Sequence, residues 1–130
     1  MTKSGNDINL EAFKKRDAKT LADIFRSQRK ALIYFAEKLL GIKEEAENMV
    51  EITFMKLWQK HADFDSFPAI KLFLYTTTRN SCLDFLKYSR KTSDLQKDFL
   101  YWSGKEQVIL QIVYEAELQS ELYGDIKILP

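Results

Sequence analysis

The chain has little of the residue types that build disulfides, metal centres and tight turns. Its 130 residues include one cysteine, Cys82, and one histidine, His61, which excludes an internal disulfide and a zinc site of the Cys2His2 kind. Four glycines and two prolines supply too few turns for a sandwich or barrel of many short strands. The composition therefore favours an all-α fold, with Cys82 as a small buried side chain.

Long apolar runs and catalytic motifs are also lacking. No stretch approaches the ~18 consecutive apolar residues of a membrane span, and residues 1–9 lack the apolar core of a signal peptide. There is no Gly-rich phosphate loop, nucleophile elbow or metal-binding helix motif, and no motif places a nucleophile beside His61. We expect a soluble, cytoplasmic protein that is not an enzyme, does not insert into a membrane, and has no catalytic residue, metal or cofactor.

What the chain does have is charge arranged in blocks. Hydrophobic residues make up 45% of the chain, enough to bury a core, and the net charge is only +1. Residues 1–43 carry ten basic and five acidic groups, residues 44–66 two and six, residues 67–91 five and one, and residues 92–130 three and seven. Alternation on this scale suggests separate surfaces for separate partners, and chance blocks are the alternative.

Hydrophobic periodicity predicts a bundle of three main helices. The segments whose apolar residues recur at three- and four-residue spacing are 17–41, 44–61 and 68–91. Asp17 or Thr20 can cap the start of the first segment, and Gly41 can end it. Pro68 suits the first turn of the third segment, which reads as one long helix.

The remainder of the chain is expected to be a separate unit. Residues 1–91 form the helical domain, and residues 92–130 contain a linker over 92–102 followed by a fourth helix that stops near Gly124. The apolar end, residues 126–130, is typical of the entrance to a further domain.

The second helix combines a large aromatic with carboxylates. Trp58 lies beside Glu47 and Glu51 at the edge of the apolar stripe, and such a composition is typical of a docking surface. The alternative is that Trp58 belongs to the core. This segment taken alone favours the core position.

The third helix ends in basic residues after an aromatic-rich loop. Asn80, Lys87 and Lys91 share one stripe, and Arg90 adds a further charge. Basic groups contact phosphates, and neighbouring aromatics can stack on unpaired bases. The alternative is a solvated helix end with aromatics that fill the core.

Three linked segments resemble a known family in their order and spacing. They are AENMVEITFMKLW (Ala46–Trp58), FLY (Phe73–Tyr75) and RNSCLDFLK (Arg79–Lys87). Together they resemble region 2 of bacterial RNA polymerase sigma factors of the extracytoplasmic-function type. The resemblance covers residues 10–91, and residues 126–130 look like the opening of the promoter-reading helix-turn-helix domain that follows in the family.

The resemblance implies that the second helix docks on the clamp helices of the largest subunit of core RNA polymerase. The positions that match the family's docking helix are Glu47, Asn48, Glu51, Phe54, Leu57 and Trp58. The family usually has an acidic residue at the position of Asn48 and glutamine at that of Glu51. These departures concern the detail of docking, not its location.

The resemblance also implies recognition and melting of the minus-ten promoter element, mainly through its non-template strand. The loop that matches the family's pocket for a flipped base consists of Asp63, Phe64, Asp65, Ser66 and Phe67. The matching positions on the next helix are Asn80, Lys87, Arg90 and Lys91. Lys87 stands where the family usually has arginine, so the charge for a phosphate is kept but the bidentate fork is lost.

Two other classes remain open from the sequence. One is a protein-interaction module bound by a regulator such as an anti-sigma factor, without DNA binding of its own. In the family an anti-sigma factor commonly covers these surfaces, so both descriptions can hold for one molecule. The other class is a plain structural helical domain, which predicts no partner.

Overall fold

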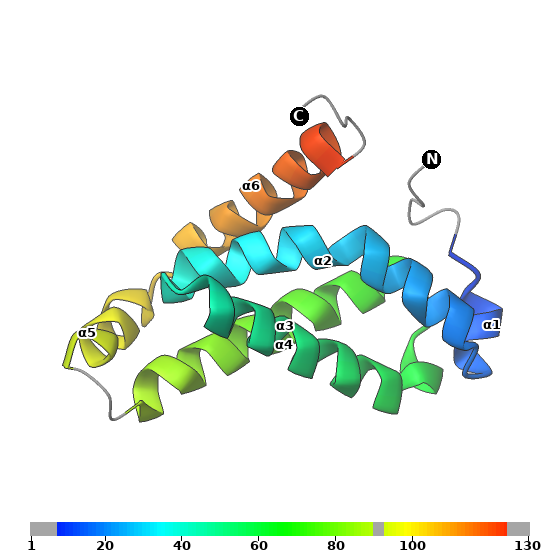
Figure 1. Ribbon diagram of the computed structural model, residues 1–130, viewed down its shortest axis with the longest axis horizontal. Helices are drawn as coiled ribbons and strands as arrows, with labels where there is room; N and C mark the ends of the chain where they lie inside the picture. The colour runs from blue at the N-terminus through cyan, green and yellow to red at the C-terminus, as the bar shows by residue number, and fades with distance from the viewer. Residues whose placement is uncertain (1–7, 90–92, 125–130) are drawn as a thin grey trace.

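The fold is all-α, as the composition predicts. A computed structural model describes residues 8–89 and 93–124 (Figure 1). The elements in chain order are α1 (Leu10–Lys14), α2 (Ala18–Leu40), α3 (Lys43–Gln59), the 3-10 helix η2 (His61–Asp63), α4 (Phe67–Tyr88), α5 (Ser93–Trp102) and α6 (Glu106–Gly124). Within these two ranges there is no strand. Helices α2, α3 and α4 are the three predicted main helices.

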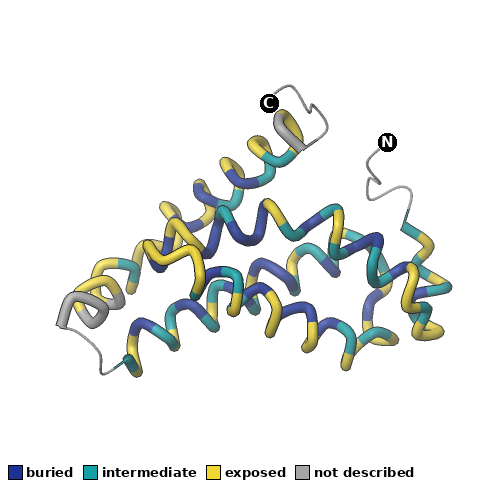
Figure 2. Tube along the Cα trace, in the orientation of Figure 1, coloured by how far each residue is buried: buried dark blue, intermediate teal, exposed yellow. Residues whose placement is uncertain are grey.

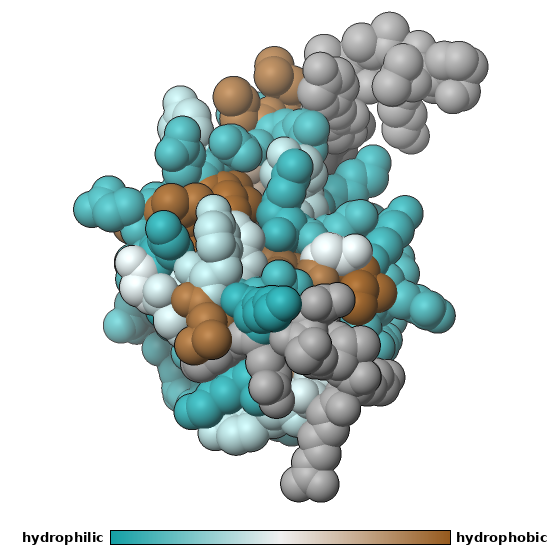
Figure 3. Space-filling model, turned by 90° about the vertical axis from the view of Figure 1, so that its left-hand side faces the viewer, coloured by the Kyte–Doolittle hydropathy of each residue, from teal (hydrophilic) through white to brown (hydrophobic). Residues whose placement is uncertain are grey.

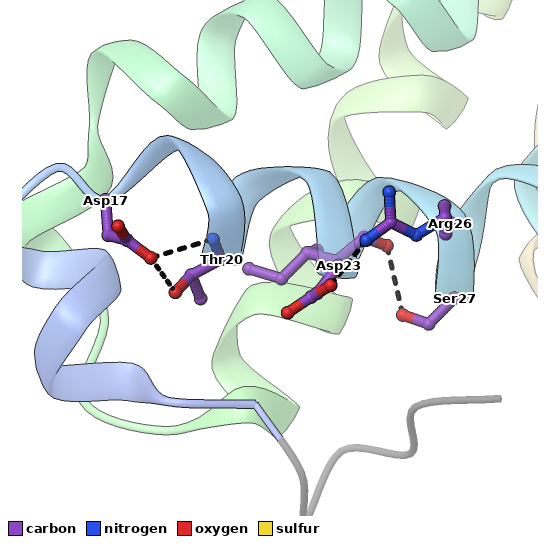
Figure 4. A network of polar contacts seen from close by, with 6 residues as sticks. Asp17, Thr20, Asp23, Arg26 and Ser27 are labelled. Carbon is purple, nitrogen blue, oxygen red and sulfur yellow. Dashed lines mark hydrogen bonds and ion pairs between the residues drawn. The ribbon is translucent and has the colours of Figure 1, made fainter. Parts of the chain in front are cut away.

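Helix α2 begins and ends at the capping residues that the sequence predicts. The Asp17 carboxylate accepts hydrogen bonds from the hydroxyl of Thr20 at 2.6 Å and from its backbone N–H at 3.0 Å (Figure 4). These bonds favour the charged form and hold the pKa of Asp17 below its usual value. One turn on, Arg26 pairs with Asp23 at 2.6 Å. At the other end Gly41 has φ of 72°. This left-handed conformation is unfavourable for residues that carry a side chain, so glycine suits the position.

Helices α2, α3 and α4 pack around one core. Gly41 and Ile42 alone join α2 to α3, so these two helices form an antiparallel hairpin, and α4 packs against both. Figure 2 shows the buried positions of the three helices facing one another. The largest fully buried side chains of these helices are Ile24, Leu32, Phe35, Leu39, Val50, Thr53, Leu57, Ile70, Leu74, Thr78 and Leu86.

One hydrogen bond crosses the core between α3 and α4. The hydroxyl oxygens of Thr53 and Thr78 are 3.0 Å apart, and both side chains are fully buried. Thr53 donates its hydroxyl proton to the backbone carbonyl of Met49 at 2.9 Å, so Thr78 is the donor across the interface. The arrangement matters because a buried hydroxyl without a partner costs about 1–3 kcal/mol.

Helix α1 is an element that the sequence analysis does not predict. Five residues are too few for hydrophobic periodicity to be visible. Asn9 caps the helix by accepting a hydrogen bond from the backbone N–H of Ala12 at 3.0 Å. Phe13 is fully buried, with its ring centroid 6.1 Å from that of Trp58. Burial of Phe13 therefore packs α1 on the end of α3.

The prediction of a linker over 92–102 is wrong for residues 93–102, which form helix α5. No glycine or proline interrupts this segment before Gly104, which has φ of 78° and follows the end of the helix. The indole N–H of Trp102 donates a hydrogen bond to the carbonyl of Leu39 at 3.1 Å, which ties the end of α5 to the end of α2. The preceding helix, α4, ends at Tyr88, and the predicted continuation to Lys91 falls outside the described residues.

Helix α6 packs back on the bundle and ends at Gly124, as predicted. Its buried residues Ile109, Ile112 and Ala116 lie along the side that meets α2. The chain segment after the predicted three-helix domain is thus part of the same packed structure (Figure 1).

Candidate functional site

The outer face of α3 is accessible and carries part of the predicted polymerase-docking set. Asn48 and Glu51 are exposed, and Glu47 is half-buried. The Glu47 carboxylate lies 3.6 Å from the guanidinium of Arg29 on α2. Met55, 64% exposed, adds an apolar side chain to this face. The face therefore combines polar, acidic and apolar groups.

Two members of the predicted docking set lie in the core instead. Phe54 and Leu57 are 6% and 0% exposed. The ring of Phe54 packs edge-on against that of Phe25 on α2, with centroids 5.0 Å apart. Both residues belong to the inward stripe of α3, so they cannot reach a partner while the bundle is folded. We therefore leave Phe54 and Leu57 out of the docking surface.

Trp58 is half-buried at the corner where α1 meets the end of α3. Its ring centroid is 6.1 Å from that of Phe13 and 5.8 Å from that of His61, and the Arg16 guanidinium carbon is 5.4 Å from it. The core alternative for Trp58 is therefore correct for part of the ring. The remaining part is accessible beside the outer face of α3.

The loop before α4 is held in shape by contacts to α1 and to α4. Lys14 pairs with Asp65 at 3.1 Å, and its carbonyl oxygen is 2.9 Å from Nδ1 of His61. Phe64 is only 7% exposed, and its ring meets that of Phe73 edge-on at 5.3 Å. Asp63 and Asp65 are exposed.

The end of the loop is also the start of α4. Ser66 is the N-cap and accepts a hydrogen bond from the backbone N–H of Ala69 at 3.2 Å, and Phe67, half-buried, is the first helical residue. The five loop positions predicted to accept a base are thus adjacent in space, but Phe64 points into the core. Its role is to fix the loop.

The polar stripe predicted on α4 is exposed. Asn80 and Lys87 lie on the accessible side of the helix, with Thr76 exposed one turn before Asn80. The Lys87 ammonium is 5.2 Å from the centroid of the neighbouring Tyr88 ring, which is itself 68% exposed. The predicted positions Arg90 and Lys91 lie outside the described residues.

Polar contacts between α4 and α6 are a feature that the sequence analysis misses. Lys71 forms an ion pair with Glu117, whose other carboxylate oxygen accepts a hydrogen bond from the hydroxyl of Tyr75 at 2.6 Å. Burial and this carboxylate raise the pKa of Tyr75, so the phenol stays protonated. Arg79 forms an ion pair with Glu106. Because Lys71 and Glu117 are 46 residues apart, no local pattern reveals the contact.

Apolar side chains remain exposed at the α5 end of the molecule and along α6. Figure 3 shows brown apolar groups between hydrophilic side chains on the end that carries α5. Leu100 on α5 is 70% exposed. On α6 the exposed apolar residues spaced four apart are Leu110, Tyr114, Leu118 and Leu122. Such a row can contact a protein partner.

A family comparison decides the class of this chain. The family model described as sigma-70 region 2 matches residues 24–92, which is more than half of the chain and includes most of α2 and all of α3 and α4. The chain belongs to the sigma-70 region 2 family. No curated protein and no solved structure matches it.

Membership of the sigma-70 region 2 family carries a role in RNA polymerase binding and promoter recognition. The match includes the outer face of α3, the loop 63–67 and the stripe on α4, whereas α1, α5 and α6 lie outside it. In the described ranges no helix is long and apolar enough to cross a membrane. Nor do three or more His, Cys, Asp or Glu side chains in these ranges gather as they would around a metal ion.

Proposed function

We propose that this sigma-70 region 2 domain is of the extracytoplasmic-function type and acts in the cytoplasm by binding alone, without catalysis. It docks on the clamp helices of the largest subunit of core RNA polymerase through α3. It then recognises and melts the minus-ten element, mainly by holding the non-template strand on α4 and on the loop before it.

The polar stripe on α4 is the observation that carries the DNA half of this proposal. Leu74, Cys82 and Leu86 bury one side of the helix, while Asn80 and Lys87 are exposed on another. A lysine placed there supplies a phosphate contact, and an amide can hydrogen-bond to a base edge. The flipped base would lie at Asp63, Asp65 and Phe67, and Arg90 and Lys91 complete the proposed set.

The DNA half is tested with a pool of single-stranded oligonucleotides that carry a randomised hexamer. The protein should enrich a sequence, and Asn80→Ala should weaken that preference. Lys87→Ala should weaken binding to all sequences and reduce the salt slope by about 0.7, the value for one phosphate contact on a single strand. Lys56→Ala is the matched control, because Lys56 is an exposed lysine on α3. Equal effects of the two lysine substitutions would contradict the proposal.

The docking half rests on the exposed residues Asn48 and Glu51 and on the accessible parts of Glu47 and Trp58. Glu51→Arg should reduce binding to a clamp-helix fragment of the matching polymerase at least tenfold, because it reverses a charge within the proposed interface. Glu37→Arg, a reversal at an exposed position of α2, is the control. Unchanged binding by Glu51→Arg would exclude docking through this face.

A regulator such as an anti-sigma factor is the second proposed partner. The row of exposed apolar residues on α6 favours a protein that covers this helix. Leu110→Ser together with Leu118→Ser should release a captured regulator while leaving the clamp-helix affinity unchanged. Loss of both affinities together would indicate a general folding defect, and loss of neither would remove α6 from the regulator's site.

A further inference from the structure

Helix α6 places two carboxylates on three polar side chains of α4. Glu117 receives the Lys71 ammonium and the Tyr75 hydroxyl, and Glu106 receives the Arg79 guanidinium. Lys71, Tyr75 and Arg79 follow one another at intervals of four residues, so they form a row along one side of the helix. Between them they offer ammonium, hydroxyl and guanidinium donors, which are the groups that bind phosphate oxygens.

The row is linked to the polar stripe proposed to contact DNA. Arg79 uses Nη1 to donate a hydrogen bond to the side-chain oxygen of Asn80 at 2.8 Å. Its Nη2 meets Glu106, while its buried Nε–H has no hydrogen-bond partner. Glu106, Arg79 and Asn80 therefore form a chain of contacts from α6 to the stripe. One donor of the guanidinium is left unused in this arrangement.

The contact between α4 and α6 is not closed by apolar packing. A groove of about 330 Å³ runs between the two helices, with Leu72 on one side and Leu110 on the other. These two side chains are 70% and 64% exposed. Of the buried residues of α6, Ile109 also lines this groove, whereas Ile112 and Ala116 do not. Across the open groove, the two carboxylates of α6 make the polar contacts to α4.

We infer that Lys71, Tyr75 and Arg79 form a phosphate-binding row on α4, and that α6 covers this row with carboxylates that compete with the backbone of single-stranded DNA. This inference rests on the proposed DNA binding by α4. A carboxylate and a phosphodiester present the same kind of anionic oxygen to the three donors. The row occupies a different face of α4 from the stripe of Asn80 and Lys87, and Arg79 links the two through its hydrogen bond to Asn80. Two members of the acidic block of residues 92–130 thereby cover a phosphate-binding surface of the same chain.

The test removes the two carboxylates without changing side-chain size. Glu106→Gln with Glu117→Gln is compared with Glu115→Gln with Glu121→Gln, which removes the same charge from exposed positions of the same helix. Filter binding of a short mixed-sequence single-stranded DNA is measured over a range of salt concentrations, with the full chain. A mixed sequence is used because contacts to the phosphate backbone are independent of base identity.

The first pair of substitutions should tighten binding about fivefold, as expected for the loss of two partly exposed ion pairs that compete with the ligand. It should also steepen the salt slope by about 1.4, the value for two additional phosphates on a single strand. The control pair should produce less than half of either effect. Adding Lys71→Gln and Arg79→Gln to the first pair should abolish the gain, because the liberated donors are then absent.

The outcomes separate this inference from the proposed function. If the two pairs of carboxylate substitutions tighten binding equally, the effect is one of net charge, and the inference is wrong. It is also wrong if the gain survives Lys71→Gln with Arg79→Gln. If the unchanged protein shows no DNA binding that responds to Lys87→Ala, the proposed function fails instead. Circular dichroism and urea titration of each variant exclude misfolding as the cause.

Discussion

The two sides of helix α4 are attached to the molecule in different ways. Towards α3 it presents fully buried groups such as Leu74 and Thr78, with the hydroxyl of Thr78 bonded to that of Thr53. Towards α6 it presents Lys71 and Arg79, which meet carboxylates beside a groove. One interface is buried, whereas the other is ionic and partly exposed.

The difference indicates which contact can be exchanged for a ligand. Apolar groups of the α3–α4 interface would meet water if the helices separated, and each fully buried leucine side chain contributes about 1.5–3 kcal/mol against separation. The ion pairs of the α4–α6 interface contribute less, because water and dissolved ions solvate the separated charges well. The bundle should therefore keep α4 in a fixed position while Lys71 and Arg79 exchange their carboxylate partners for a ligand.

Cysteine labelling should show the largest difference between the two interfaces. Cys82 is fully buried on α4, and burial raises the pKa of its thiol to about 12. It should react with a maleimide only when the bundle opens, whereas a thiol introduced by Leu110→Cys on α6 should react at once. At neutral pH the thiol introduced at position 110 should react more than about a thousandfold faster than Cys82, since opening a domain costs at least ~5 kcal/mol. Peptide mass spectrometry separates the two sites, and similar rates would contradict the comparison.

Truncation of a core leucine should have the next largest effect. Leu57→Ala should lower the free energy of unfolding by about 3 kcal/mol, because it leaves a cavity at the fully buried interface of α3. Ile112→Ala on α6 should lower it by less than half of that, because α6 can detach before the bundle unfolds. Urea denaturation measures both, and Met55→Ala at a 64% exposed position is the control. Equal losses for Leu57→Ala and Ile112→Ala would show that α6 is integral to the core.

The direction of the threonine hydrogen bond predicts an asymmetric result. Thr53→Val should cost about 2 kcal/mol, because it leaves the buried hydroxyl of Thr78 without its acceptor. Thr78→Val should cost about 1 kcal/mol, since Thr53 still donates to the carbonyl of Met49. The midpoints of urea unfolding distinguish the two variants. A larger loss for Thr78→Val than for Thr53→Val would show that Thr53 is the donor in the hydrogen bond between the two hydroxyls.

The smallest effect on stability is expected at the ionic interface. Glu106→Gln with Glu117→Gln should lower the free energy of global unfolding by less than about 1 kcal/mol, because the ion pairs are partly exposed. Hydrogen exchange should nevertheless accelerate in α6 and stay unchanged in α3. Slower exchange of α6 in the variant would show that the carboxylates do not hold this helix.

Much of the fold was predictable because local rules act within single helices. Asp17 and Gly41 bound α2 as capping rules require, and Pro68 lies in the first turn of α4. Helix α1 is not predicted, because five residues are too few for hydrophobic periodicity to be visible. Helix α5 replaces the predicted linker because no helix breaker lies within residues 93–102.

The candidate site was less predictable than the fold. The family resemblance placed Leu57 on the docking surface, while the apolar periodicity of α3 placed it in the core, and its burial agrees with the periodicity. Asn80 was found from its spacing along α4, and it is exposed. Lys71 and Arg79 carried no local signal, because their partners on α6 are brought near only by the tertiary fold. Such ion pairs between distant helices depend on how α6 packs on the bundle, which the local sequence does not specify.

The hydrogen bond from Trp102 to Leu39 has a spectroscopic consequence. The chain contains two tryptophans, and Trp102 is bonded through its indole N–H to the end of α2. Replacing the other by Trp58→Phe leaves Trp102 as the single indole emitter. Its emission maximum should shift to the red when water replaces the Leu39 carbonyl and the packed surface around the ring. The Trp58→Phe variant therefore carries an optical reporter for the packing of α5 against the end of α2.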